Sequence, residues 1–424
     1  MNDTNLLYDT STGSLLELDE VTARSAENIR SSADFAKIDD PNIQADLKSL
    51  IDDGVILSDI SFPKPQKLRP KSLCLIVSHA CDMSCTYCSL AGITGEDKLM
   101  KPEKAKQALS WLVDVSPGRK IDIDFFGGEP LLAWNTVKEA VLFGEKLMEE
   151  NDKLIRWSLS TNCLSLTDEK IKFCRDHYIS LIMSLDGTKE NHDKYRKLRN
   201  GDGSFDKIFP TIKKITENWN QGFYVRGTYT KETFNFSDTV ISLHKMGIKN
   251  LAFEPVVTGD KNIGFTLDDL PKIRLEYEKL AKYYVECRKK NIPIRFYHFE
   301  LNLDGGVCTR KSAGGCGAGC EYISISPDGS MWVCHQLDGI IEHRIGSMEN
   351  PLADEIFDRL SGINHITNKN ECPDCWASYL CAGGCIASNV LYEGDFASPY
   401  RIGCEIQKIR LETALWIQSE LLKN

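Results

Sequence analysis

Three features are missing from this sequence of 424 residues, and each absence excludes a class of protein. No apolar run is long enough to span a bilayer, so we expect no membrane-spanning helix and no membrane partner. The N-terminus, MNDTNLLYDTST, has neither a basic start nor an apolar core, which excludes a secretory signal and predicts a cytoplasmic protein. An excess of basic charge is also missing, because the formal net charge is −10, and we therefore expect no nucleic-acid partner.

The acidic residues are concentrated at the start of the chain. Residues 1–60 hold 13 Asp and Glu against 4 Lys and Arg. Two short apolar segments, 6–8 and 15–18, flank a Ser-Thr-Gly-Ser turn and predict a hairpin, and a helical pattern follows at 41–53. A basic stretch with three prolines then indicates a linker. We therefore assign residues 1–65 to a small N-terminal α+β module.

The middle of the chain alternates short apolar segments with longer amphipathic ones. Six such repeats predict a parallel sheet covered by helices. The fold class is therefore α/β, with a partial (β/α)6 TIM-like barrel over residues 66–300 and a Cys-rich domain over residues 301–424. The expected strands are 73–78, 121–126, 156–161, 181–186, 223–230 and 251–256, and the expected helices are 102–115, 134–150, 167–177, 236–246, 267–290 and 404–422.

Cysteine is abundant, with sixteen residues, and a reducing compartment disfavours disulfides. The first group reads Cys81-x₃-Cys85-x₂-Cys88, which is enough for three irons of a [4Fe–4S] cube. No fourth cysteine lies in the loop, so one iron would be open to the amino and carboxylate groups of S-adenosylmethionine (SAM). The alternative is a structural zinc site, with His79 as the fourth ligand.

Polar and small residues follow the next strands, at the end of a barrel where chemistry is expected. Two glycines let the backbone approach a ligand closely, and a carboxylate or a serine can bind an ammonium, ribose or carboxylate group. The alternative for each position is an ordinary turn at a strand end. The candidate residues are Gly127, Gly128, Glu129, Ser160, Asn162, Ser184 and Asp186.

A second group of cysteines lies near the C-terminus. Eight cysteines can satisfy two four-iron cubes, and a zinc ribbon is the alternative. The members are Cys316, Cys320, Cys334, Cys372, Cys375, Cys381, Cys385 and Cys404. Five further cysteines fit no cluster pattern, and we expect most of them to be buried, inert thiols: Cys74, Cys163, Cys174, Cys287 and Cys308.

The CxxxCxxC loop followed by Gly-Gly-Glu-Pro resembles the radical SAM superfamily. The resemblance implies that Tyr87 lies near the adenine and that Gly127, Gly128 and Glu129 hold the methionine amino group. It also implies that reductive cleavage of SAM gives a 5′-deoxyadenosyl radical. One departure is visible, because family members often have Gly where this chain has Cys163.

The second group resembles the SPASM extension of radical SAM peptide-modifying enzymes, in which a Gly-x₄-Cys segment precedes CxxCx₅Cx₃C and a last Cys. By that resemblance the cofactors are SAM and three [4Fe–4S] clusters. An open iron in the first auxiliary cluster would result if Cys320 is not a ligand. The implied ligands are Cys316, Cys320, Cys334 and Cys385 for the first auxiliary cluster, and Cys372, Cys375, Cys381 and Cys404 for the second.

The resemblance implies a substrate that is a short ribosomally made precursor peptide with a leader sequence, and an electron donor such as flavodoxin or ferredoxin. The residue after Cys334 is His335, where the sulfatase-maturating branch has an Asp, and this favours thioether crosslinking over formylglycine formation. Carbon–carbon crosslinking is an alternative. We expect His335 to be either a catalytic base or a structural residue, and residues 1–65 to be either a leader-peptide module or a capping element.

Overall fold

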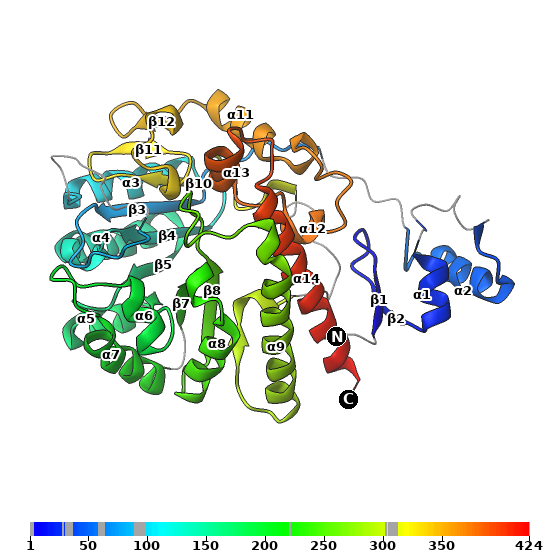
Figure 1. Ribbon diagram of the computed structural model, residues 1–424. Helices are drawn as coiled ribbons and strands as arrows, with labels where there is room; N and C mark the ends of the chain where they lie inside the picture. Colours follow the sequence, from blue (N-terminus) through cyan, green and yellow to red (C-terminus); the bar gives the residue numbers. More distant parts are fainter. Residues whose placement is uncertain are drawn as a thin grey trace.

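The computed structural model describes residues 4–27, 29, 37–57, 64–88, 99–219, 222–301, 303 and 313–423. The strands among these residues form two sheets (Figure 1). One is a hairpin of β1 (Asn5–Tyr8) and β2 (Leu15–Leu18). The other has the order β12-β11-β10-β3-β4-β5-β6-β7-β8-β9. Its strands are β3 (Ser72–Ser78), β4 (Lys120–Gly127), β5 (Leu154–Thr161), β6 (Ile179–Ser184), β7 (Phe223–Tyr229), β8 (Asn250–Pro255), β9 (Arg295–Phe296), β10 (Tyr322–Ile325), β11 (Ser330–Trp332) and β12 (Arg344–Ser347).

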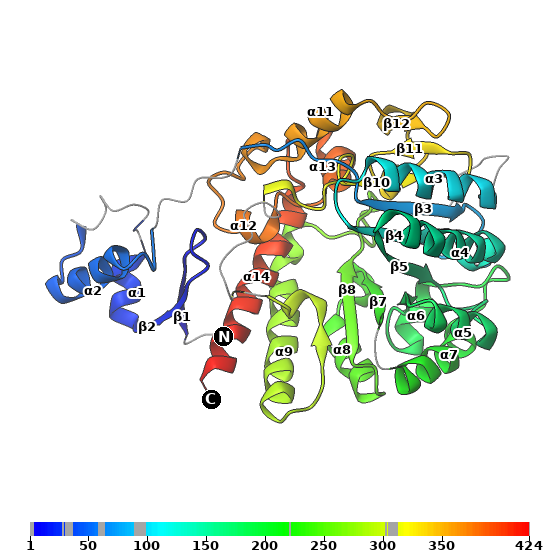
Figure 2. The ribbon, with the colours of Figure 1, turned by 180° about the vertical axis from the view of Figure 1, so that it is seen from behind.

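Strands β3 to β8 are all parallel and neighbours in sequence order, which confirms the predicted α/β partial barrel. Helices follow these strands and cover the outer face of the sheet (Figures 1 and 2). A long connection of this kind is what parallel pairing requires. The covering helices are α3 (Pro102–Val115), α4 (Trp134–Asn151), α5 (Asp168–Asp176), α6 (Lys189–Tyr195), α7 (Phe205–Asn218) and α8 (Phe236–Lys245).

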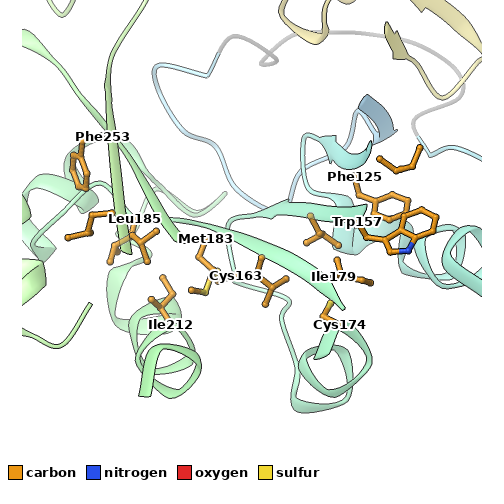
Figure 3. Close-up of a cluster of buried hydrophobic side chains, with 14 of the residues drawn as sticks. Phe125, Trp157, Cys163, Cys174, Ile179, Met183, Leu185, Ile212 and Phe253 are labelled. Carbon is orange, nitrogen blue, oxygen red and sulfur yellow. The ribbon is translucent and has the colours of Figure 1, made fainter. Parts of the chain in front are cut away.

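The core lies between the sheet and these helices. On β4, Ile121, Ile123 and Phe125 are fully buried, whereas the alternating Asp122 and Asp124 face the barrel interior and are half-buried. Two predicted inert thiols, Cys163 and Cys174, lie among the buried side chains of this core, which Figure 3 shows beside the stacked rings of Phe125 and Trp157. The barrel therefore has an extensive apolar core that needs no metal.

The C-terminal strands continue the same sheet. β10 pairs in parallel with β3, and β11 and β12 follow it in antiparallel register. Ile323 and Ile325 on β10 are fully buried in the barrel core. Beyond them the chain forms short helices and turns with only small apolar clusters. The helices of this part are α11 (Asp354–Asn364), α12 (Ser378–Cys381) and α13 (Ile386–Glu393).

Two long helices lie at the open side of the barrel. α9 (Leu270–Lys289) and α14 (Arg401–Leu422) pack along each other, and the β1–β2 hairpin lies beside α14 (Figures 1 and 2). The hairpin is followed by α1 (Glu20–Ala26) and α2 (Pro41–Asp52). Within the described ranges, no helix is both long and apolar enough to cross a membrane.

Candidate active site

The first cysteine loop leaves the carboxyl end of β3. The Cys81 sulfur accepts hydrogen bonds from Met83 N at 3.4 Å and from Asn162 Nδ2 at 3.8 Å. N–H donors directed at sulfur favour the thiolate, which is the form that binds metal. Cys85 raises the pKa of Cys81, and Cys88 raises the pKa of Cys85, through their negative charges, although burial is the larger cause in each case. The three predicted ligands therefore form one neighbouring group.

The two glycines of Gly-Gly-Glu-Pro lie against this loop. A Cβ at Gly127, where φ is 136°, would lie 2.1 Å from Ser78 O, and a Cβ at Gly128 would lie 2.5 Å from Ala80 O. Gly128 N donates to Ser78 O at 2.6 Å, and Glu129 N donates to Ala80 O at 2.9 Å. Only glycine permits this contact, so these residues fix where the cysteine loop begins. Their contact with the methionine amino group stays a prediction.

Glu129 is completely buried at the end of β4. Its carboxylate accepts hydrogen bonds from Leu131 N at 3.0 Å, Thr161 Oγ1 at 2.8 Å and Asn162 N at 2.8 Å, which join the ends of β4 and β5. Burial nevertheless raises the pKa of Glu129 to about 7. A cationic ligand would offset the cost of burying this charge, and the ammonium of SAM is a cation of that kind.

Asp186, just beyond β6, joins three other elements. It accepts hydrogen bonds from Tyr87 Oη and from Thr228 N (2.9 Å), and Arg196 Nε lies 3.0 Å from Asp186 Oδ1. The Arg196 guanidinium also lies 5.7 Å from the ring centre of Tyr87. Tyr87 and Asp186, both predicted cofactor-binding residues, are therefore in direct contact. Sequence reasoning missed Arg196, because nothing in its spacing separates it from the neighbouring basic residues of 194–199.

Asn162 donates hydrogen bonds to two residues of the cysteine loop, Cys81 and Asp82. Its Nδ2 donates to Asp82 Oδ1 at 2.7 Å, and Ser165 Oγ donates to Asp82 Oδ2 at 2.7 Å. The next residue, Cys163, has φ of 68° and is 1% exposed. Glycine adopts this left-handed backbone without strain, which explains why glycine suits the position. Here the Cys163 side chain packs into the core instead (Figure 3).

The inner face of the barrel is lined with polar side chains. Ser160 and Ser184 are half-buried at the ends of neighbouring strands. They lie on the inner face because the residues that alternate with them are buried in the core on the other face. Asp124 lies deeper and accepts a hydrogen bond from Ser158 Oγ at 2.9 Å. Burial raises the pKa of Asp124 to about 6, and the positive charge of Arg226 on β7 acts against that rise. The alternation of Ile and Asp in 121–126 is the sequence signal that places Asp124 on the polar face of the strand.

His335 lies across this interior, directly after Cys334. Its Nδ1 is 2.6 Å from Tyr322 Oη, and its ring packs 4.7 Å from that of Phe126, the residue before Gly127. Burial and the charge of Arg226 lower the pKa of His335 to about 4, so the imidazole is neutral near pH 7. A neutral imidazole can accept a proton, and its hydrogen bond to Tyr322 also orients it. Both predicted roles of His335 remain open.

The C-terminal cysteines divide into two neighbourhoods. Cys316 and Cys385 each raise the pKa of Cys334, although burial is the larger cause. In the same way, Cys381, Cys372 and Cys375 each raise the pKa of Cys404. The two predicted ligand sets group the same cysteines, with Cys320 added to the first set, and they stay a prediction. Cys308 lies outside the described residues.

Cys320 lies in an apolar surrounding of its own. It is completely buried beside Leu68 and Leu360, and its sulfur donates to Gly317 O at 3.3 Å. Asn364 Nδ2 lies 3.7 Å from the same sulfur. The Cys320 thiol therefore has an apolar surrounding and its own hydrogen bonds, while Cys316, Cys334 and Cys385 form a set of three.

The chemistry of the donor groups fits iron–sulfur clusters. In the described part of the chain, no three His, Cys, Asp or Glu side chains are arranged around a single metal ion. A cubane cluster does not require such an arrangement, because each thiolate binds a different iron. His79, the proposed fourth ligand of a zinc site, has its Nε2 2.6 Å from Asp338 Oδ2 instead. The three cysteine sets supply soft sulfur ligands of the kind that iron–sulfur clusters use.

Comparisons with known proteins agree with this geometry. Residues 75–235 match the family described as the Radical SAM superfamily. The radical SAM cyclopropyl synthase TigE of Paramaledivibacter caminithermalis is 22% identical over 80% of this chain and 72% of its own length. A cysteine-type anaerobic sulfatase-maturating enzyme of Clostridium novyi is 26% identical over 74% of this chain and 88% of its own length.

Two solved structures share the fold. Native anSMEcpe with bound AdoMet and the Kp18Cys peptide has a TM-score of 0.67 at 22% identity, covering 81% of this chain and 97% of its own. Streptococcus suis SuiB bound to the precursor peptide SuiA has a TM-score of 0.58 at 17% identity, covering 94% of this chain and 98% of its own. Both matches extend well beyond the barrel.

Proposed function

We propose that this radical SAM enzyme oxidises a ribosomally made precursor peptide and forms a thioether crosslink in it. The observation that carries the proposal is the contact between His335 and Phe126. Phe126 directly precedes the Gly127–Gly128–Glu129 segment, and His335 directly follows Cys334. This contact supports the proposal, because a first auxiliary cluster held by Cys334 would then lie near the strand end expected to hold SAM.

The residues at the barrel mouth fit SAM and a [4Fe–4S] cluster. Cys81, Cys85 and Cys88 would hold the cluster, and the bound group would supply a 5′-deoxyadenosyl radical that removes a hydrogen atom from a peptide carbon. Glu129 would neutralise the methionine ammonium. The chain itself contributes position, because Asp82 and Gly128 fix the loop on which the three cysteines stand.

The separation of Cys320 from the other cysteines supports the thioether product. With three cysteine ligands, Cys316, Cys334 and Cys385, a first auxiliary cluster has one iron open to a peptide thiolate. Its sulfur would bond to the carbon radical, and the electron left over from that bond would pass to the cluster. The thiol proton needs an acceptor, and the neutral His335 lies beside Cys334, with Nδ1 3.7 Å from its sulfur.

A second candidate function is formylglycine formation, which the similarity to anaerobic sulfatase-maturating enzymes favours. Carbon–carbon crosslinking uses the same site and remains the third candidate. In formylglycine formation an aldehyde replaces the cysteine or serine side chain, whereas a thioether keeps the sulfur in the peptide. The products therefore differ in mass and in sulfur content.

The N-terminal hairpin fits a role in binding the leader of such a peptide. In the described residues, the smaller sheet consists of β1 and β2 alone, so each strand has one edge without a partner strand. A peptide in extended form adds to an edge of this kind through main-chain hydrogen bonds. The acidic residues of 1–60 would favour a basic leader. Deleting residues 1–65 should weaken binding of the precursor, and unchanged binding would exclude the role.

The experiment uses the anaerobically purified protein with SAM, dithionite and the cysteine-containing peptides encoded by short reading frames beside its gene. The expected product is lighter than the precursor by two hydrogens and has lost one thiol that iodoacetamide can alkylate. A loss of H₂S with formation of an aldehyde would show formylglycine formation instead. An unchanged number of reactive thiols with the loss of two hydrogens would show carbon–carbon crosslinking.

A further inference from the structure

A buried lysine lies between the two C-terminal cysteine neighbourhoods. Lys369 is 4% exposed and follows the short helical turn Ile366–Asn368. Its Nζ donates a hydrogen bond to Gly383 O at 2.9 Å, in the segment between Cys381 and Cys385. The contact is close, since a Cβ at Gly383 would lie 2.6 Å from Lys369 Cδ. The chain therefore holds the ammonium against the loop that supplies one ligand to each proposed auxiliary cluster.

Lys369 lacks the partner that a buried ammonium normally has. Among the described residues it forms no ion pair within 4.0 Å, and Gly383 O is its one hydrogen-bond acceptor. An ammonium has three donors and is costly to bury without a compensating negative charge. Burial lowers the pKa of Lys369, and negative charge on four cysteines, two from each neighbourhood, would act against that fall: Cys372, Cys316, Cys381 and Cys385.

Neutral thiols would not provide that compensation. Thiolates that bind iron carry the missing negative charge, because a metal displaces the thiol proton. We propose that Lys369 is the internal counter-ion shared by both auxiliary clusters, and that its charge sets their reduction potentials. The inference rests on the proposed presence of two auxiliary clusters.

The sign of the effect follows from electrostatics. Reduction adds one electron to a cluster, and a fixed positive charge nearby stabilises the added negative charge more than it stabilises the oxidised state. Burial prevents water and salt from screening this interaction. Lys369 therefore makes both auxiliary clusters better acceptors for the electron that the crosslinking step leaves over.

The test measures cluster potentials rather than turnover. The Cys81/Cys85/Cys88→Ala protein, which lacks the first cluster, is compared with the same protein carrying Lys369→Gln, Lys369→Met or Lys369→Arg. Gln keeps a hydrogen-bond donor for Gly383 O without the charge, Met removes both, and Arg keeps the charge. Lys408→Met is the matched control, because Lys408 is partly exposed and paired with Glu405 at 2.8 Å. Iron content and redox titration followed by electron paramagnetic resonance are the readouts.

Lys369→Gln should keep about eight irons. We expect the equilibrium constant for reduction of both clusters to fall at least tenfold, equivalent to about 59 mV toward negative potential. The cluster potentials of Lys369→Arg should stay near those of the parent protein. The potentials of Lys408→Met should shift less than those of Lys369→Gln. Unchanged potentials in Lys369→Gln or in Lys369→Met, with full iron content, would overturn the counter-ion role of Lys369 and leave the proposed function standing. About four irons in the unsubstituted protein would instead contradict the three-cluster proposal.

Discussion

The barrel and the C-terminal cysteine region differ in the kinds of side chain that they bury, although they share one sheet. The barrel buries a continuous apolar core between strands β3 to β8 and their helices. The region from 313 to 404 adds Ile323, Ile325 and Phe357 to that core but has only small apolar clusters of its own. Among its buried groups are several cysteines and one lysine without an ion pair in the described residues. Hydrophobic burial can stabilise the first, whereas we expect the second to depend on bound metal.

This difference explains where each region places its ligands. At the barrel mouth the three cysteines stand on a loop whose Asp82 accepts hydrogen bonds from Asn162 and Ser165, outside the loop. We therefore expect this site to form before metal binds. In the C-terminal region the cysteines are themselves part of the small core, as Cys334 and Cys372 are buried. We therefore expect metal binding and folding to be coupled in that region and independent in the barrel.

Removing one ligand at the barrel mouth should give the largest effect on activity. Cys85→Ala should abolish deoxyadenosine release from SAM under dithionite and lower the iron content by about four, because the first cluster cannot assemble. The fold should persist, since Cys85 itself is not part of the apolar core. Cys174→Ala, a core cysteine without a predicted ligand role, is the control and should retain activity. Deoxyadenosine release by Cys85→Ala would show that this loop does not initiate the chemistry.

Removing all iron with a chelator should separate the two regions most clearly. Amides of residues 366–404 should lose protection from hydrogen exchange, while those of β3 to β8 keep theirs, because we expect only the first set to depend on metal. Mass spectrometry of exchanged peptides measures this. Equal loss of protection in both regions would mean that the barrel also requires metal to fold.

Single cysteines within the C-terminal region should have unequal effects on iron. Cys381→Ser should lose about four irons, whereas Cys320→Ser should lose none, because Cys320 already donates to Gly317 O and lies apart from the other sulfurs. Iron and sulfide analysis of the two purified variants shows whether Cys320 is a cluster ligand. Loss of about four irons from Cys320→Ser would make Cys320 a ligand and close the iron proposed to bind the peptide thiolate.

Acid should weaken the protein through buried imidazoles, of which His335 lies in the C-terminal region and His192 lies in the barrel, on α6. His192 is fully buried, accepts from Asp186 N at 3.2 Å and has its Nε2 2.8 Å from Ser204 Oγ. Burial lowers the pKa of His192 to about 4. The unfolded chain therefore binds more protons below pH 6.5, and stability should fall by up to about 3 kcal/mol as the pH drops from about 6.5 to 4.

Urea unfolding of the barrel at several pH values measures this loss. His192→Gln removes the titrating group and should flatten the pH dependence, even though it lowers stability overall. An equally steep loss of stability in His192→Gln would assign the effect to another group.

Much of the barrel could be predicted because its signals are local. Alternating apolar residues on β4 and the apolar spacing of α3 and α4 gave strands and helices close to their true bounds. No helix was expected at α7, where Pro210 interrupts the sequence, yet Phe205, Ile208, Ile212 and Ile215 form one buried stripe that holds it. Tertiary burial there outweighs the local cost of a proline.

The sequence by itself determined the cysteine groups, the glycine turn and the order of strands, because these depend on spacing along the chain. Only the tertiary structure decided which distant groups meet. It brought Arg196 to Asp186, His335 to Phe126 and Lys369 to Gly383. It also buried Cys320 beside Leu68 and Leu360. Such contacts depend on packing between elements far apart in sequence, and no periodicity along the chain encodes them.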